Sequence, residues 1–175
     1  MRRASAGASS QSVTRRLVTG FVLRTLLGWT VGLTLLAILP QVGRWAIQAT
    51  LSNLLLVLHA LSLSGHVSGD VLVAPGATIQ IVDECTSVLP TVLLGVAMAS
   101  YPAAAAWKLI GLVVGTVALW VYNLLRVLGL LVVLAWRPEL FEIVHVYVWQ
   151  TMTFLAVAGL FVLWLRLERS AGRAG

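Results

Sequence analysis

Long apolar runs, separated by short polar or turn-forming segments, dominate the chain from residue 17 onward. A helix that crosses a lipid bilayer needs about 20 mostly apolar residues. Five segments approach that length, at about 17–39, 45–63, 86–101, 107–136 and 138–167. We therefore predict one all-α integral membrane domain over residues 17–167, between a basic N-terminal tail of residues 1–16 and a basic C-terminal tail of residues 168–175.

The second of these segments, about 45–63, differs from the other four in its pattern. Polar side chains recur through it and at its two ends with near-helical spacing; they are Arg44, Gln48, Ser52, His59 and Ser62. A polar stripe on an otherwise apolar helix is typical of an amphipathic helix that lies in the membrane interface. We expect this segment to lie in or dip into the outer interface, and the other four segments to cross.

A polar connection, "SGHVSGDVLVAPGATIQIVDE", separates the second and third apolar segments. It contains two short stretches rich in β-branched residues, and Pro75-Gly76 between them suits the centre of a type II turn. We expect a small outer β-hairpin whose second strand leads to Cys85.

The composition excludes a soluble domain of this size. Hydrophobic residues make up 59% of the chain, the mean hydropathy is +0.96 and only 10% of residues are charged. The net charge of +6 comes from basic residues that gather at the two ends and flank apolar runs. That distribution indicates membrane topology and argues against a nucleic-acid-binding face.

The orientation follows from the arginines of the two tails, which are Arg2, Arg3, Arg15 and Arg16 at one end and Arg166, Arg169 and Arg173 at the other. Positive charge is retained on the cytoplasmic side, so both termini are expected in the cytoplasm. Both ends on one side require an even number of crossings, which agrees with four. We expect no cleavable signal peptide, since Arg24 interrupts the first apolar run. The expected location is the cytoplasmic (inner) membrane of a bacterium or archaeon.

Three residues that can carry chemistry fall near the outer face in this topology. Cys85, the only cysteine, opens the third segment, and a single cysteine excludes an intramolecular disulfide. Arg126 lies 18 residues beyond Lys108, which is about 27 Å along a helix that starts at the inner face. His145 lies two turns into a fifth helix that begins at Pro138, a favoured first-turn residue.

These three residue types suit cysteine-based peptide chemistry. A nearby cation and a helix N-terminus both favour the reactive thiolate, and Arg126 can supply a permanent charge that also stabilises an oxyanion. His145 can take up the thiol proton and return it to a leaving amine. Asn123 lies one turn before Arg126 and can orient the guanidinium or a substrate carbonyl.

Structural roles are open for the same residues. Cys85 can be inert packing, Arg126 can pair with Glu142 or Asp83, and His145 can be partnered by Glu142 one turn earlier. Asp83 and Glu84 are expected to be solvated outer-loop residues without a catalytic role.

Three short motifs resemble one known family. "DECTS" (83–87), "NLLRV" (123–127) and "FEIVHVYVWQ" (141–150) occur in that order, and each lies at the expected outer face. The chain is similar over about residues 45–166 to the exosortase/archaeosortase family of membrane cysteine transpeptidases, and most similar to the compact subgroup called exosortase H. Ser87 departs from the family pattern, which often has glycine two residues after the cysteine.

The resemblance implies Cys85 as the nucleophile, Arg126 as the electrostatic stabiliser and His145 as the acid/base. Asn123, Thr86, Ser87 and Glu142 are candidates for binding or orienting the substrate, and Thr86 and Ser87 can also hydrogen-bond a helix N-terminus. Such enzymes cleave a C-terminal sorting signal, made of a short motif, a transmembrane helix and a basic cluster, on the outer side. They transfer the acyl group to an acceptor, which no residue here identifies. The partners expected are therefore the anchored substrate and the lipid bilayer, with no cofactor, metal or nucleic acid.

Three other readings remain. A non-catalytic scaffold subunit of a secretion or polysaccharide-export system would share the topology without needing Cys85. A small transporter could use Arg24, His59 or Arg126, although the ionisable groups gather at one face and not at the midplane. A metal site would draw on His59, His66, Asp70 and Cys85, whose spacing matches no familiar ligand pattern.

Overall fold

The computed structural model describes residues 3–174, with side chains for residues 18–171. The protein is mostly helical, with one small sheet. The helices are α1 (Arg3–Ile38), α2 (Pro40–Ala60), α3 (Val88–Ser100), α4 (Ala105–Trp136), α5 (Phe141–Ile143) and α6 (Gln150–Ala174). Shorter helical turns are η1 (Asp83–Cys85), η2 (Pro138–Leu140) and η3 (Val144–Trp149), and the strands are β1 (His66–Ser68), β2 (Val71–Ala74) and β3 (Ala77–Gln80).

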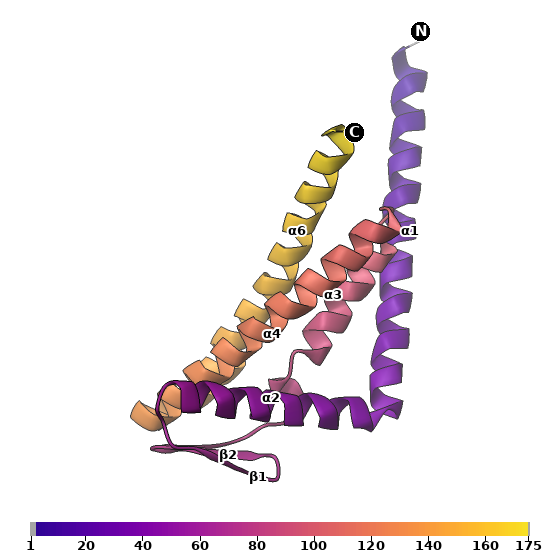
Figure 1. Cartoon of the computed structure of the whole chain (residues 1–175). Helices are drawn as coiled ribbons and strands as arrows, with labels where there is room; N and C mark the ends of the chain where they lie inside the picture. The colour runs from indigo at the N-terminus through magenta and orange to yellow at the C-terminus, as the bar shows by residue number, and fades with distance from the viewer. Residues whose placement is uncertain (1–2, 175) are drawn as a thin grey trace.

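The bundle consists of α1, α3, α4 and α6, which run alternately in opposite directions (Figure 1). α3 packs against α1, α4 and α6, so it is the centre of the bundle. Both chain ends lie on one side, and α2 and the sheet lie on the other (Figure 1). We call these two sides the terminus end and the sheet end.

Three helical stretches are long and apolar enough to cross a membrane among the described residues: Val18–Ile38, Ala105–Trp136 and Pro138–Ala171. They correspond to the first, fourth and fifth segments predicted from the sequence. The third segment, predicted over about 86–101, forms the 13-residue helix α3. At 1.5 Å per residue α3 is about 20 Å long, shorter than a hydrocarbon core of about 30 Å.

The second predicted segment forms α2, which begins directly after α1 and lies across the end of the bundle (Figure 1). The backbone of Leu39 is not helical, so α1 ends before it. Pro40 occupies the first turn of α2, where the missing backbone N–H of proline has no helical partner to lose. One face of α2 is buried through Ile47, Leu51, Leu54 and Leu58, which recur every three or four residues. The polar stripe predicted from the sequence, Arg44, Gln48, Ser52, His59 and Ser62, is exposed.

The connection that follows α2 forms three antiparallel strands in the order β1-β2-β3, where the sequence predicted two. β2 and β3 pair around Pro75-Gly76, and Gly76 has a φ of 77°, a conformation that favours glycine. The strand missed in the sequence is β1, which is only three residues long and mostly exposed. Leu72 and Ile79 point from the sheet into the core and fix it beneath α2 and α4.

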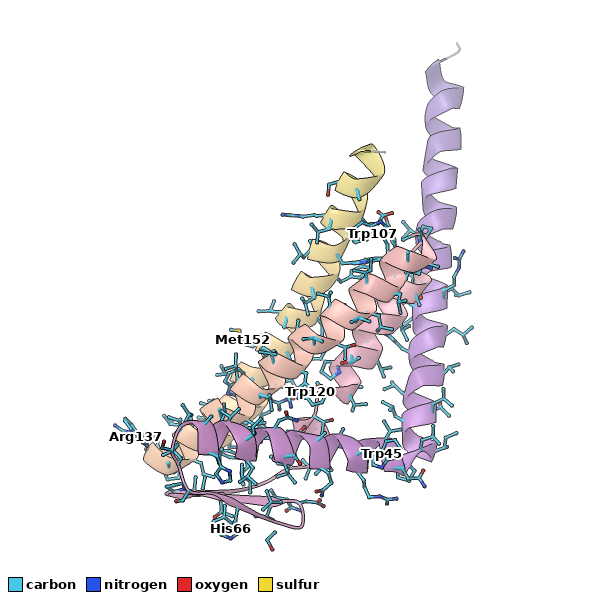
Figure 2. All side chains as sticks on the ribbon, viewed as in Figure 1. Trp45, His66, Trp107, Trp120, Arg137 and Met152 are labelled. Carbon is cyan, nitrogen blue, oxygen red and sulfur yellow. The ribbon has the colours of Figure 1, made fainter. Side chains whose placement is uncertain are left out.

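The two ends of the bundle have separate buried cores. At the sheet end, α2, the sheet, the turn at Cys85 and the last third of α4 share one cluster. At the terminus end, Leu94, Met98, Leu119 and Trp164 form a second cluster. There Trp164 donates a hydrogen bond of 2.9 Å to the carbonyl of Trp107, and its ring meets Tyr101 and Phe161. Figure 2 shows Trp107 near the terminus end, and Trp45 at the sheet end.

Helical structure also extends into both predicted tails, since α1 begins at Arg3 and α6 continues to Ala174. The side chains of Arg2, Arg3, Arg15, Arg16 and Arg173, on which much of the predicted orientation rests, lie outside the described side chains.

Candidate functional site

Cys85 ends a single 3-10 turn, η1, at the point where the chain leaves the sheet and approaches α3. The sequence predicted that Cys85 opens the third helix, but α3 begins only at Val88. Thr86 is extended, and its hydroxyl donates a 2.7 Å hydrogen bond back to the carbonyl of Asp83. That bond closes the turn, and the extended backbone of Thr86 keeps it out of α3. Ser87 occupies the N-cap position of α3 without a side-chain hydrogen bond.

Two side chains of α4 hold this turn from the opposite side. Asn123 donates a hydrogen bond of 2.8 Å from Nδ2 to the carbonyl of Cys85. Arg126, one helical turn further on, donates from Nη1 to the carbonyl of Glu84 at 3.1 Å. Both side chains are buried, with exposed fractions of 4% and 7%. The backbone on either side of the thiol-bearing Cα is therefore fixed to α4.

The cysteine side chain belongs to the core of the sheet end. Cys85 is 3% exposed and packs in the same cluster as Leu54, Ile81 and Val127. It is a free thiol. Its two neighbours in sequence, Glu84 and Thr86, both line a groove at the surface of the bundle, whereas Cys85 does not.

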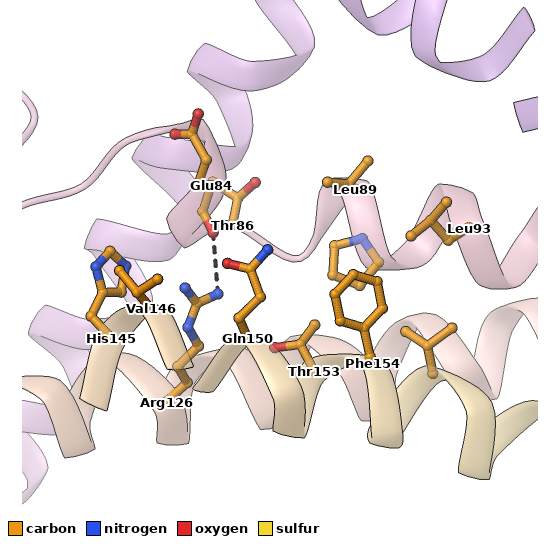
Figure 3. A pocket seen from close by; sticks show the side chains of 12 residues that line it. Glu84, Thr86, Leu89, Leu93, Arg126, His145, Val146, Gln150, Thr153 and Phe154 are labelled. Carbon is orange, nitrogen blue, oxygen red and sulfur yellow. Dashed lines mark hydrogen bonds between the residues drawn. The ribbon is translucent and has the colours of Figure 1, made fainter. Parts of the chain in front are cut away.

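That groove, which we call the site groove, has a volume of about 220 Å³ and lies between α3, α4 and the start of α6 (Figure 3). One half is polar and contains the Glu84 carbonyl, Arg126, His145 and Gln150. The other half is apolar and is lined by Leu89, Pro90, Leu93, Phe154 and Val157. The groove therefore offers hydrogen-bonding groups at the sheet end and an apolar surface toward the middle of the bundle.

Arg126 is a buried cation without a carboxylate partner. The one salt bridge among the described residues joins Arg137 to Glu139, both of which are exposed. The sequence offered Glu142 or Asp83 as partners for Arg126, and neither forms a salt bridge with it. Its Nε also has no hydrogen-bond acceptor. A buried and uncompensated charge is costly, so this side chain favours an anion in the site groove.

Glu84 contributes its backbone and not its acid group to Arg126. Its carbonyl faces the guanidinium, while the carboxylate points away from it (Figure 3). Asp83 is directed to α2, where it packs so closely against Gly43 that any side chain there would overlap its carboxylate. A side chain at position 43 would therefore force the exposed carboxylate of Asp83 to move.

His145 lines the site groove from η3 and lies beside Val146 on the same side as Arg126 (Figure 3). Its ring packs against that of Phe141, with 5.4 Å between centroids. The charged groups around it are Arg126, Glu142 and Glu84. Glu142, predicted as its partner, is exposed and forms no hydrogen bond with His145 in the described part of the chain.

The fifth predicted helix is not uniform, because its first part is a 3-10 turn and Val144–Trp149 form a π-helix. Residues five apart lie about 140° apart around an α-helix, but a π-helix repeats at about this interval and brings them onto one face. His145 and Gln150 are five apart and both line the site groove. π-Helical turns are frequent at functional sites.

Gln150 and Thr153 were not predicted as site residues. Thr153 donates to the carbonyl of Trp149 at 2.8 Å, and Tyr122 of α4 lies within hydrogen-bonding distance of both groups. This contact fixes α6 to α4 directly beside the groove. Gln150 ends the motif that contains His145, and a search for polar residues in an apolar run would have found it.

The alternative metal site is not assembled among the described residues, where no three His, Cys, Asp or Glu side chains gather. Comparisons of the chain with known protein families, with curated proteins and with solved structures found no match.

Proposed function

We propose that this protein is a membrane-embedded cysteine endopeptidase and transpeptidase of the exosortase type. The observation that carries the proposal is Arg126, a buried guanidinium that lacks an anionic partner, lines the site groove and binds the backbone directly beside Cys85. Such a preorganised cation suits a site where negative charge develops during the reaction. His145 and Gln150 line the same groove.

The reaction has two steps. The Cys85 thiol loses its proton to His145, and its sulfur attacks the scissile carbonyl to form a tetrahedral oxyanion that Arg126 stabilises. The C–N bond breaks, His145 returns the proton to the leaving amine, and a thioester remains on Cys85. An acceptor amine or water then attacks the thioester and releases the thiol. Asn123 is a positioning residue, since it holds the Cys85 carbonyl and not the substrate.

Catalysis requires the thiol to turn out of the core into the site groove. Glu84 and Thr86, on either side of Cys85, line that groove, so the thiol lies next to it, and entry of the sulfur requires a rotation of the Cys85 side chain together with a shift of the turn η1. Binding of a peptide carbonyl beside Arg126 would favour the rotated state.

The proposed topology has four crossings, with the site on the outer side and both termini in the cytoplasm. α1, α3, α4 and α6 alternate in direction, and both ends of the chain lie on the same side (Figure 1). α3 is short, but the extended residues before and after it lengthen the crossing. α2 would then lie in the outer interface, which its exposed polar stripe suits.

The shape of the site groove suits a substrate that is anchored in the membrane. Its polar half would hold the scissile peptide bond, and its apolar half would contact the residues that enter the bilayer. The substrate class proposed is a secreted protein that ends in a short motif, an apolar helix and a basic tail. The acyl acceptor lies on the outer surface.

The test is co-expression with secreted proteins from the same genome that carry such a C-terminal signal. Cys85→Ala and Cys85→Ser should abolish their processing, measured as the shift in mass of the substrate, while both variants accumulate in the membrane. Ser52→Ala is the matched control, because it also removes one side-chain atom but from the exposed face of α2. Processing by the two Cys85 variants at the wild-type rate would exclude the enzyme.

A second candidate is a non-catalytic scaffold subunit of a secretion or polysaccharide-export system. The observation that favours it is the burial of Cys85 in the core, outside the site groove. A scaffold would need the packing of Cys85 but not its sulfur chemistry. It therefore predicts that Cys85→Ser retains the biological function of the protein.

A further inference from the structure

A second groove lies at the terminus end, where α6 approaches α1 (Figure 1). We call it the terminus-end groove. Its volume is about 370 Å³, and it is lined by residues of α1, of the connection after α3 and of α6. Phe21, Tyr101 and Phe161 form an aromatic wall, with Phe21 in contact with both other rings.

One cation, Arg24, lines this apolar groove. Arg24 lies within the candidate span Val18–Ile38, eight residues beyond Arg16, which is about 12 Å along the helix from the basic residues at the start of the apolar run. Its Nη2 lies within 3.7 Å of the position that a side chain on Gly20 would occupy, so the guanidinium runs back toward the terminus end. A long basic side chain in a span extends in this way toward the headgroup region.

The groove has a surplus of positive charge. No salt bridge joins Arg24 to a carboxylate among the described residues. Lys108 adds a second cation nearby, because its ammonium donates a 2.8 Å hydrogen bond to the carbonyl of Ala99, beside the groove residue Ser100. Glu168 lies one turn beyond the groove residue Leu165 and forms no salt bridge with Arg24 or Lys108.

We propose that the terminus-end groove binds one anionic phospholipid, with the phosphate on Arg24 and an acyl chain against the aromatic wall. An apolar groove between membrane helices is filled by lipid in a bilayer, and the cations at its rim select a negatively charged headgroup. The bound lipid would join α1 to α6. This is a use for Arg24 that does not depend on the reaction proposed for Cys85.

The test is native mass spectrometry of the full-length protein, incubated with equal amounts of phosphatidylglycerol and phosphatidylcholine that carry the same acyl chains. The wild-type protein should retain one phosphatidylglycerol in preference to phosphatidylcholine. Arg24→Gln should weaken that preference about fivefold, which is the size expected for one basic residue. Arg24→Lys keeps the charge and should preserve most of it.

The matched control is Arg44→Gln, which removes an exposed arginine from α2 at the sheet end. Its lipid preference should equal that of the wild type, whereas an equal loss in both variants would show general surface charge and overturn the proposal. Equal retention of the two lipids by the wild type would overturn it as well. If Arg24→Gln fails to accumulate, the preference of the wild-type protein should still fall as the salt concentration rises, and an unchanged preference would contradict the site.

Discussion

Arg126 and Arg24 lie in candidate spans at opposite ends of the bundle, and neither forms a salt bridge with a carboxylate among the described residues. Arg126 at the sheet end is buried and held by the carbonyl of Glu84. Arg24 at the terminus end is exposed and lies along its own helix. A buried, fixed cation can act on a charge that develops at one atom, whereas an exposed one can only select a charged neighbour. This difference in burial is the reason that we propose chemistry at Arg126 and lipid binding at Arg24.

The packing around the two arginines also differs between the two ends of the bundle. The sheet end joins α2, the sheet and α4 in one core, and two buried side chains of α4 clamp the turn that carries Cys85. The terminus end relies on aromatic rings and on close approach at glycines. At Gly111 any side chain would overlap the indole of Trp164.

The largest expected effect is the loss of substrate processing when the buried Arg126 is replaced. Arg126→Gln should lower processing of a co-expressed substrate by about 10²–10³-fold, the range measured when one oxyanion donor is removed. Arg126→Lys should not restore activity, because an ammonium group on a flexible stem does not hold its N–H groups in the planar, fixed arrangement of a guanidinium. Near-normal processing by the lysine variant would show that only diffuse charge is needed.

At the terminus end, Gly111→Ala should destabilise the protein by about 2–4 kcal/mol, from overpacking against Trp164 and loss of the hydrogen bond from Trp164 to Trp107. Thermal unfolding in detergent measures this effect. Gly159→Ala is the matched control, since a side chain on Gly159 would meet nothing within 4 Å. Equal unfolding temperatures of the two variants would contradict the close packing of α4 against α6.

A smaller effect is expected from loss of a hydrogen bond between α4 and the turn that carries Cys85. Asn123→Ala leaves the buried carbonyl of Cys85 without its donor, which should cost about 1–3 kcal/mol in the free energy of unfolding. The turn should loosen, so a small maleimide should label Cys85 faster than in the wild type. Unchanged labelling together with unchanged stability would mean that the hydrogen bond from Asn123 does not hold the turn.

The sequence predicted the features that depend on hydropathy over long stretches. Three apolar segments form helices long enough to cross a membrane, and the odd polar stripe of α2 is exposed. These patterns depend on many residues, so one exception, such as Arg24 within α1, does not obscure them.

The details at the site depend on single interactions and could not be predicted in the same way. α3 begins only at Val88, because Thr86 is extended and closes the turn at Cys85 through its bond to Asp83. The π-helix that brings Gln150 to the side of His145 has no sequence signature. The burial of Cys85, away from the site groove, depends on how the sheet, α2 and α4 meet.

The relation between Arg126 and Cys85 can be tested without any substrate. Cys85 is the only cysteine, so alkylation by iodoacetamide reports on this thiol alone. The comparison is between Asn123→Ala and Arg126→Gln, because each removes one hydrogen bond from α4 to the turn that carries Cys85, and only Asn123→Ala keeps the cation. At neutral pH, folded Asn123→Ala should react about tenfold faster than folded Arg126→Gln, since the proposed role of Arg126 is to stabilise the attacking sulfur anion. Both variants should react equally once denatured. Equal rates in the folded state, or a faster reaction of Arg126→Gln, would show that Arg126 does not activate Cys85.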